Sequence, residues 1–408
     1  MASMPMNREF AEVRAPLTPA LSRGERGKSS ARLMRVFFGL SVLLTSAATT
    51  NATQLTQQDI FVGGQGGYHT YRIPSLIVTK KGTVLAFCEG RKKSGSDTGD
   101  IDLLLKRSWD GGKTWGNQQV VWDDGTNTCG NPCPVVDDET GIIWLLATHN
   151  PGGATEKEIT SKKSNGARTV WLLKSKDDGK NWSAPVNITE SVKDTNWNWY
   201  ATGPGIGIEI QQGRHRGRLV VPCDHSSGGD TGAEQGSHAI YSDDHGRTWN
   251  PGEAVRPKMN ECQVVELADG KGTLLLSMRN YLKEGRRAHS ISQDGGVTWT
   301  APEPDPALAD PVCQASILRY NWPGPGVCGR ILFSNPTSIH REKMTVRISY
   351  DDGKSWPVSK LLYSGPSAYS CLTELPDRTI SCLYERGNTN AYEKITFAQF
   401  PIAWLEGD

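Results

Sequence analysis

The chain has 408 residues, and its 45 lysines and arginines nearly balance 44 aspartates and glutamates, which leaves a formal net charge of +1. This balance argues against a nucleic-acid-binding surface, because such a surface needs clustered positive charge. No segment approaches the twenty or so consecutive apolar residues of a membrane-spanning helix. We therefore expect no nucleic acid partner and no stable membrane insertion.

Residues 1–52 look like a leader rather than part of a fold. Arg32 and Arg35 precede the apolar run 36–44, which small residues follow up to Ala52. This order is typical of a secretory signal peptide. We predict an N-terminal extension and signal peptide over 1–52 and export to the periplasm or the extracellular space. Two alternatives stay open, because Met34 could be the true start and the segment could be an amphipathic anchor.

From residue 53 onward, one strand pattern recurs six times. An apolar strand-like opening is followed by a short turn and a second apolar segment. The openings begin at Tyr71, Asn131, Gly203, Glu261, Cys313 and Tyr369. The second segments read TVLAFCEG, GIIWLLATH, GRLVVPC, TLLLSMRN, RILFSNP and TISCLYE. Regular repetition of this kind predicts a β-repeat architecture.

In five of the six units a third strand-like segment leads into one octapeptide. It starts with Ser, has Asp at the third position and Gly at the fifth, and ends on Trp. The copies are SWDGGKTW from Ser108, SKDDGKNW from Ser175, SDDHGRTW from Ser242, SQDGGVTW from Ser292 and SYDDGKSW from Ser349. These boxes predict hairpin turns, in which Asp accepts hydrogen bonds from turn amides, Gly takes a positive φ and Trp anchors the turn. The sixth unit has a third segment, ITFAQFPIAW, but no box.

Successive boxes start 67, 67, 50 and 57 residues apart, which suits four-stranded propeller blades with some longer loops. We predict that residues 53–408 form one all-β domain, a six-bladed β-propeller. The segment Gln58–Gly63 would be the fourth strand of the last blade, so that the N-terminal strand closes the ring and removes its open edge.

In this topology the box turns lie on one face of the disc. The starts of the first strands and the loops after the second strands lie on the other. The chemistry-bearing side chains at the latter positions are Arg72, Arg91, Asp97, Glu261, Arg279, Arg341 and Tyr369. Clustered guanidinium groups need an anion, and arginine binds a carboxylate in a planar, bidentate manner. The aspartate offers a general acid or base, and the tyrosine needs a neighbouring base to act as a nucleophile.

These motifs resemble those of the sialidases (neuraminidases), and most closely the bacterial secreted type. The boxes are similar to the family's Asp-boxes (BNR repeats), and Tyr71-Arg72-Ile73-Pro74 matches its F/Y-R-I-P motif. The resemblance covers essentially all of the chain after about residue 58. It implies that Arg72, Arg279 and Arg341 hold the carboxylate of a sialic acid.

The same resemblance implies the remaining roles. Asp97 would be the acid/base, Glu261 would activate Tyr369 as the nucleophile, and Arg91 would support the site near Asp97. A neutral tyrosine suits an anomeric carbon that carries its own carboxylate, and sialidases depart from the usual two-carboxylate scheme in this way. The implied reaction is the retaining hydrolysis of terminal α-linked sialic acids through a sialyl-tyrosine intermediate.

Two of these assignments involve a choice between neighbours. Asp100 and Asp102 compete with Asp97, but both run into a strand, whereas Asp97 lies in the preceding loop. Arg347 competes with Arg341. It stands two residues before its box and so lies near the box face, whereas Arg341 stands eight residues before it and reaches the opposite face.

The aromatic residues Trp197, Trp199 and Tyr200 open the third unit and could line a substrate pocket. An aromatic rim that packs on itself is an equally good interpretation.

Other classes of function also remain open. A non-catalytic sialoglycan-binding propeller would need the boxes but not the Asp, Glu and Tyr together. A trans-sialidase would use the same residues. We expect no cofactor and no metal, and a monomer that acts on sialylated glycoproteins, glycolipids or oligosaccharides.

The nine cysteines give a mixed signal for an exported protein. Four lie in apolar strand-like segments, where a buried thiol is expected. These are Cys88, Cys262, Cys371 and Cys382. The loop-flanked pairs Cys129/Cys133 and Cys313/Cys328 could form disulfides.

Overall fold

The computed structural model describes residues 54–228 and 234–407. The predicted extension and signal peptide over 1–52 lie outside the described residues. Within the described part of the chain, no helix is long and apolar enough to cross a membrane.

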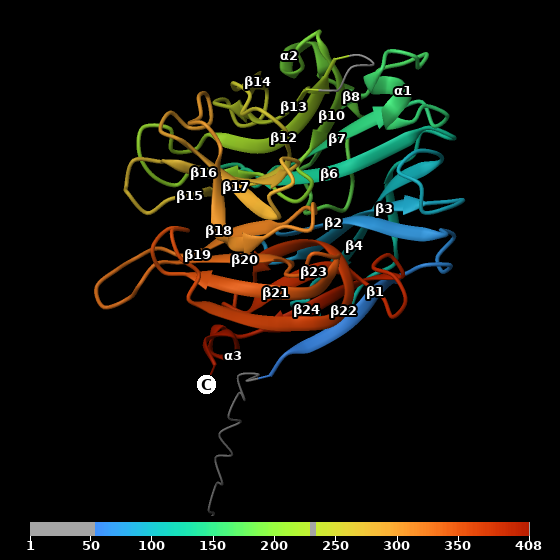
Figure 1. The fold of residues 1–408 in the computed structure, drawn as a ribbon. Coiled ribbons are helices and arrows are strands. Elements are labelled where there is room, and N and C mark those ends of the chain that lie inside the picture. Colours follow the sequence, from blue (N-terminus) through green and yellow to red (C-terminus); the bar gives the residue numbers. More distant parts are fainter. Residues whose placement is uncertain (1–53, 229–233, 408) are drawn as a thin grey trace, which may run out of the picture. The chain divides into compact units, whose positions relative to one another are not determined.

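The fold is built of curled, mainly antiparallel sheets, so the all-β prediction is confirmed (Figure 1). The described residues form four hydrogen-bonded sheets. The first contains β2 (Thr70–Val78), β3 (Val84–Arg91), β4 (Ile101–Ser108), β5 (Gln119–Trp122), β6 (Thr128–Val136), β7 (Ile143–Asn150), β8 (Thr169–Ser175) and β9 (Val186–Asn187). The second contains β10 (Trp197–Thr202), β11 (Ile208–Glu209), β12 (Leu219–Ser227), β13 (Glu234–Ser242) and β14 (Asn250–Pro251).

The other two sheets come from the C-terminal half and from the start of the described chain. The third contains β15 (Met259–Glu266), β16 (Leu274–Asn280), β17 (Arg286–Ser292) and β18 (Glu303–Ala309). The fourth runs in the order β1 (Thr56–Val62), β24 (Lys394–Phe400), β23 (Ile380–Arg386), β22 (Val358–Glu374), β21 (Glu342–Ser349), β20 (Arg330–Pro336) and β19 (Ser316–Asn321). The helices are short: α1 (Glu156–Thr160), α2 (Thr189–Val192) and α3 (Ile402–Glu406).

Strands from the two ends of the described chain lie side by side. Strand β1 pairs antiparallel with β24, and Figure 1 shows this blue strand along the red C-terminal ones. Strand β22 is long enough to pair with β21 through its first half and with β23 through its second. A single parallel pair, Ile101 with Thr128, connects β4 to β6.

Two sequence-based strand boundaries are wrong. The predicted opening at Gly203 is interrupted, because Gly203 and Gly205 take φ values of +69° and +127° that no regular strand accommodates. The strand of this unit, β10, ends before them, at Thr202. The segment 395–404 is a strand only as far as Phe400, and after Pro401 it turns into helix α3.

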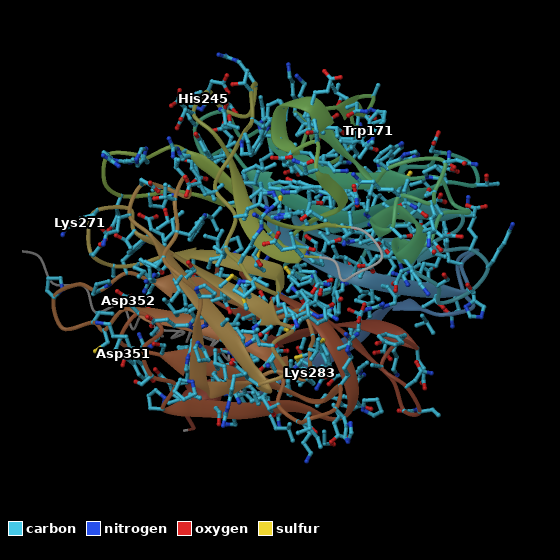
Figure 2. All side chains as sticks on the ribbon, turned by 45° about the horizontal axis from the view of Figure 1, so that its top comes forward. Trp171, His245, Lys271, Lys283, Asp351 and Asp352 are labelled. Atoms are coloured by element: carbon cyan, nitrogen blue, oxygen red, sulfur yellow. The ribbon has the colours of Figure 1, made fainter. Side chains whose placement is uncertain are left out.

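The boxes fold as predicted. In the first box, Ser108 Oγ donates to Asp110 at 2.8 Å, while the amides of Gly112 and Thr114 donate to Ser108 Oγ and Asp110 at 2.8 and 2.9 Å. Equivalent bonds recur in the other four boxes. In every box the fourth and fifth residues both have positive φ, and the fifth is always a glycine, which adopts this conformation without steric cost. Figure 2 shows His245, Asp351 and Asp352, from two of the boxes, at the periphery of the molecule.

The tryptophans of the first two boxes pack against strands that are distant in sequence. Trp115 meets Phe397 edge-on with 5.0 Å between ring centroids, and Trp182 meets Phe87 in the same way at 5.7 Å. These two boxes therefore hold neighbouring groups of strands together, which is the anchoring role predicted for Trp.

The first box gives a direct test of this packing. Gly112 and Gly111 have similar backbone conformations, with φ values of +86° and +71°. A Cβ added at Gly112 would lie 2.2 Å from the Phe397 ring, whereas a Cβ added at Gly111 would have no atom closer than 3.9 Å. Gly111→Ala should cost only the backbone strain, about 1 kcal/mol, and Gly112→Ala should cost about 3 kcal/mol because overpacking is added. Urea unfolding of the two variants measures this difference. Equal losses would show that the box does not pack tightly on Phe397.

All nine cysteines are free, so the two candidate disulfides are wrong. Cys129 and Cys133 lie four residues apart in the same extended strand, β6. At the usual rise per residue, their Cα atoms are too far apart for a disulfide. Cys313 is buried and Cys328 is exposed. The four cysteines expected to be buried thiols are buried.

Candidate active site

All seven candidate residues line one cavity. They are Arg72, Arg91, Asp97, Glu261, Arg279, Arg341 and Tyr369. The cavity has a volume of about 160 Å³, roughly ten times the 10–15 Å³ that one water needs, so it suits part of a small molecule. No residue of the five boxes, all of which are described, lines it. The strand starts and the loops after second strands therefore come together, as the topology predicts.

Tyr369 and Glu261 form the most closely connected pair in the cavity. The Tyr369 hydroxyl lies 2.6 and 2.7 Å from the two Glu261 carboxylate oxygens, and Arg279 Nη1 donates to Glu261 at 2.7 Å and to the Tyr369 hydroxyl at 3.1 Å. Burial and the Glu261 carboxylate raise the pKa of Tyr369 well above its usual value, although nearby arginines act in the opposite direction. The phenol is therefore neutral at rest, with a proton acceptor in direct contact.

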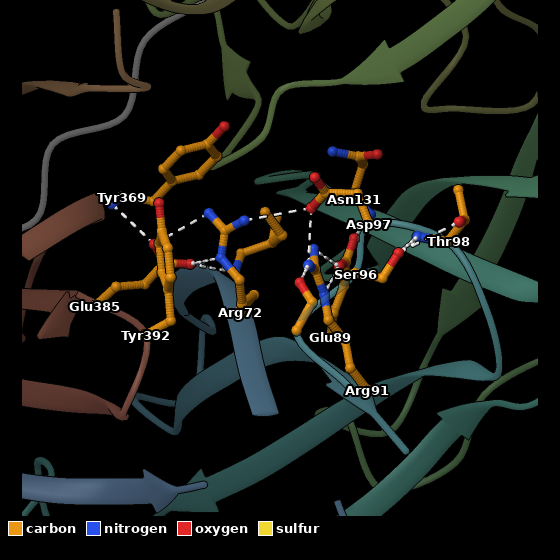
Figure 3. A network of polar contacts seen from close by, with 12 residues as sticks. Arg72, Glu89, Arg91, Ser96, Asp97, Thr98, Asn131, Tyr369, Glu385 and Tyr392 are labelled. Carbon is orange, nitrogen blue, oxygen red and sulfur yellow. Dashed lines mark hydrogen bonds and ion pairs between the residues drawn. The ribbon is translucent and has the colours of Figure 1, made fainter. Parts of the chain in front are cut away.

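Arg72 is fixed between two carboxylates (Figure 3). Its Nε and Nη2 donate to the two oxygens of Glu385 at 3.1 and 3.3 Å, and its Nη1 donates to Asp97 at 3.3 Å. Glu385 is completely buried and also accepts from the amides of Ile73 and Tyr369, at 2.8 and 3.1 Å. One carboxylate thus holds Arg72 and the backbone of Tyr369 together.

Asp97 sits at the other end of this network. Arg91 donates to it at 2.7 Å and is itself held by Glu89 at 2.7 Å. The Asp97 side chain is 71% exposed, so solvent can reach it. Burial of part of the group opposes its ionisation, but Arg91 and Arg72 outweigh that effect and lower the pKa of Asp97. In the free protein Asp97 is therefore a carboxylate at neutral pH.

Arg341 differs from Arg72, Arg91 and Arg279, each of which is paired with a carboxylate. Among the described residues no carboxylate lies within 4 Å of it, and its two terminal nitrogens donate to the Tyr392 hydroxyl at 2.8 Å and to the Val312 carbonyl at 2.9 Å. An arginine without a counter-charge beside a cavity is well suited to receive an anion.

The residues weighed against Asp97 and Arg341 lie outside the cavity. Asp100 pairs with Lys92 at 2.9 Å, and Asp102 is buried and accepts from Tyr68 at 2.6 Å. Arg347 donates to Asn335 at 3.0 Å.

Only one residue of the aromatic group faces the cavity. Trp199 lines it and lies under the Arg168 guanidinium at 4.1 Å. Trp197 instead stacks on His225 with 3.7 Å between ring centroids, and Tyr200 is buried against His238. For Trp197 and Tyr200, aromatic packing is therefore the correct interpretation.

Sequence reasoning missed several polar residues of the site, including Glu89, Asp224 and Glu385. A simple signal could have found them, because each is the sixth residue of the second strand of its unit. The residues at that position in the six units are Glu89, Thr148, Asp224, Arg279, Asn335 and Glu385. All six are polar and lie near the C-terminal end of the strand, and three of them, Glu89, Asp224 and Arg279, line the cavity.

Comparison with known proteins agrees with this geometry. The model of the BNR repeat-like domain matches residues 82–382. An exo-alpha-sialidase from Aspergillus fumigatus is 33% identical over 372 residues, which cover 83% of this chain and 86% of that protein. The chain belongs to the sialidase family. The resemblance inferred from the boxes and the Tyr-Arg-Ile-Pro motif is thereby confirmed, and sialidases are glycoside hydrolases.

Two further sialidases show how far the likeness extends. A sialidase from Micromonospora viridifaciens is 38% identical over 363 residues, which cover 86% of this chain and 54% of that protein. The chain thus spans about half the length of this relative. A solved structure titled "Hadza microbial sialidase" has a TM-score of 0.75 at 31% identity, and the match covers 86% of this chain and 69% of that one.

Proposed function

We propose that this chain is an exo-sialidase that hydrolyses terminal α-linked sialic acids of glycoproteins, glycolipids or oligosaccharides with retention of configuration. One observation carries the proposal: the Tyr369 hydroxyl lies 2.6–2.7 Å from both oxygens of Glu261, in a cavity that also holds Arg72, Arg279 and Arg341. A glycan-binding protein would have no need for a phenol next to a base.

The three arginines receive the sialic acid carboxylate. Arg72 and Arg279 are already paired with Glu385 and Glu261, so they bring fixed donors to the cavity but little uncompensated charge. Arg341 supplies the uncompensated positive charge. The carboxylate is attached to the anomeric carbon, so binding it in this way also fixes the position of the reacting carbon.

In the first half-reaction, the Tyr369 oxygen attacks the anomeric carbon while its proton passes to Glu261. The bond from the anomeric carbon to the leaving oxygen breaks, and protonated Asp97 gives that oxygen its proton. The products are a sialyl-tyrosine and a free alcohol. The high pKa of Tyr369 makes proton transfer during attack necessary, because the phenolate is not present beforehand.

In the second half-reaction, a water molecule gives a proton to the Asp97 carboxylate and attacks the anomeric carbon. The bond to Tyr369 breaks, and its oxygen takes back the proton from Glu261. Asp97 must be protonated for the first step, although Arg91 and Arg72 lower its pKa in the free protein. A bound substrate carboxylate shares Arg72 with Asp97, which weakens this effect and raises the pKa of Asp97 toward its usual value.

The larger architecture fits the same proposal. The four sheets can be divided into six four-stranded blades. In this division β22 contributes to two blades, and β1 is the outer strand of the last blade and closes the ring. We further propose that residues 1–52 direct export and are removed, and that the mature protein is a monomer.

The proposal is tested by incubating the protein with a fluorogenic α-sialoside and with sialyllactose. Release of free sialic acid from both is expected. Transfer of sialic acid to added lactose, with little hydrolysis, would assign a trans-sialidase instead. Binding without turnover of either substrate would assign a sialoglycan-binding protein.

The arginine roles are separated by a matched pair of variants. Arg341→Ala should weaken binding of the planar 2,3-unsaturated analogue of sialic acid at least about tenfold, because a charge-assisted pair is lost. Arg347→Ala removes an arginine from the same strand region outside the cavity and should change the affinity less than about twofold. Calorimetric titration compares them, and the reverse order would place the carboxylate elsewhere.

A further inference from the structure

Tyr392 lies in the loop between β23 and β24 and contacts two of the cavity arginines. The centroid of its ring lies 4.2 Å from the Arg72 guanidinium carbon, and its hydroxyl accepts a hydrogen bond from Arg341 Nη1 at 2.8 Å. Tyr392 does not itself line the cavity. Figure 3 shows it beside Arg72, next to Glu385.

The loop that carries Tyr392 is held in place by its own hydrogen bonds. The Glu393 carboxylate accepts from the amides of Asn388, Thr389 and Asn390, at 3.0, 2.7 and 3.1 Å. The Asn390 side chain in turn accepts from the Tyr392 amide at 2.9 Å. The ring is thus presented on a fixed loop rather than on a freely moving one.

The need for such a support follows from the position of Arg341. Arg72 has Glu385 and Arg279 has Glu261 to fix their planes, but Arg341 has no carboxylate partner among the described residues. A carboxylate behind Arg341 would fix it, but would also neutralise the charge that the ligand needs. A phenol oxygen and the Val312 carbonyl direct the guanidinium plane without that cost, because both are neutral acceptors.

We propose that Tyr392 is a positioning residue that sets Arg72 and Arg341 in the orientation needed to grip the substrate carboxylate. The inference rests on the carboxylate-binding role proposed above. The ring restrains Arg72 through a cation–π contact, and the hydroxyl restrains Arg341 through a charge-assisted hydrogen bond. Because one rigid side chain contacts both, the two guanidinium groups keep a constant separation before the substrate arrives.

Two substitutions separate the two contacts, and the chain offers a matched control. Tyr392→Phe removes only the bond to Arg341, and Tyr392→Leu removes the ring over Arg72 as well. Tyr320 has its ring 4.6 Å from the Arg378 guanidinium carbon and donates through its hydroxyl to the Arg378 carbonyl at 3.0 Å, and it lies outside the cavity. Tyr320→Phe therefore makes the same chemical change away from the site and from the loop that carries Tyr392.

The experiment measures inhibition by the 2,3-unsaturated sialic acid analogue and by its methyl ester, which lacks the negative charge. Tyr392→Phe should weaken the acid about tenfold and the ester less than twofold, and Tyr392→Leu should weaken the acid about a hundredfold. In an Arg341→Ala background, Tyr392→Phe should have no further effect. Tyr320→Phe should leave the affinity for both inhibitors unchanged.

Three outcomes overturn the inference. Wild-type affinity for the acid in Tyr392→Phe does so directly. Equal losses of affinity for the acid and for the ester would assign Tyr392 a structural role only. The phenylalanine variant shows this even if the leucine variant does not fold. If the wild-type protein neither binds the acid nor cleaves a sialoside, the proposed function is overturned as well. If the wild type is active and Tyr392→Phe has no effect, only this inference is overturned.

Discussion

Tyr369→Phe is expected to lower kcat on sialyllactose by at least about 10³-fold while the protein stays folded, because the phenol oxygen that forms the covalent bond is removed and the ring is kept. Within the described part of the chain, its hydroxyl hydrogen-bonds only to Glu261 and Arg279, so little else is disturbed. Release of free sialic acid measures the effect, and circular dichroism checks the fold.

The control for this variant is Tyr320→Phe. Tyr320 is also buried, and its hydroxyl donates to the Arg378 carbonyl at 3.0 Å outside the cavity. This change should leave kcat within twofold of wild type. Activity of Tyr369→Phe within tenfold of wild type would assign the nucleophile to another group.

Glu261→Gln should be nearly as damaging as Tyr369→Phe, because the phenol then has no base beside it.

Asp97→Asn should have an effect that depends on the leaving group. On sialyllactose, whose leaving oxygen needs a proton, the rate should fall about 10²–10⁴-fold, the usual value of general acid catalysis. On an aryl sialoside with a good leaving group, the first step needs no acid and the loss should be at least tenfold smaller. Parallel assays of kcat/KM on the two substrates measure the difference.

Asp100→Asn is the matched control, since Asp100 is three residues away and pairs with Lys92 rather than facing the cavity. It should leave both substrates nearly unaffected. Equal losses on the two substrates for Asp97→Asn would remove Asp97 from the acid role. A larger loss for Asp100→Asn would mean that the wrong aspartate of this loop has been chosen.

The repeat pattern could be predicted from the sequence because its signals are local. Each box needs only its own Ser, Asp, Gly and Trp to make its turn, and each apolar strand is recognisable by itself. The strand predicted to open at Gly203 is wrong because its backbone depends on a distant part of the chain. A Cβ at Gly205 would lie 2.6 Å from the side chain of Gln263, so that backbone is shaped by a contact 58 positions along the chain.

The same distinction holds for the site. The strand order places the candidate residues at one mouth, and the structure brings all of them to one cavity. Their supports, Glu385 in β23 and Tyr392 in the loop before β24, could not be assigned in this way, because both are more than 300 residues away from Arg72 in sequence. Glu385 does carry a signal, since an ionisable residue near the end of an apolar second strand is costly to bury without a partner. Tyr392 carries none that we can identify.

The central claim is that Tyr369 forms a covalent bond to the sugar, and trapping that bond tests it most directly. A 3-fluorosialosyl fluoride carries a good leaving group and an electron-withdrawing fluorine, so it should form the sialyl-enzyme faster than water can break it down. Peptide mass spectrometry after incubation should find one fluorosialyl group on the peptide that contains Tyr369, and none in Tyr369→Phe. A stable adduct on Glu261 or Asp97, or sialic acid released first as the β-anomer with no adduct at all, would contradict the account.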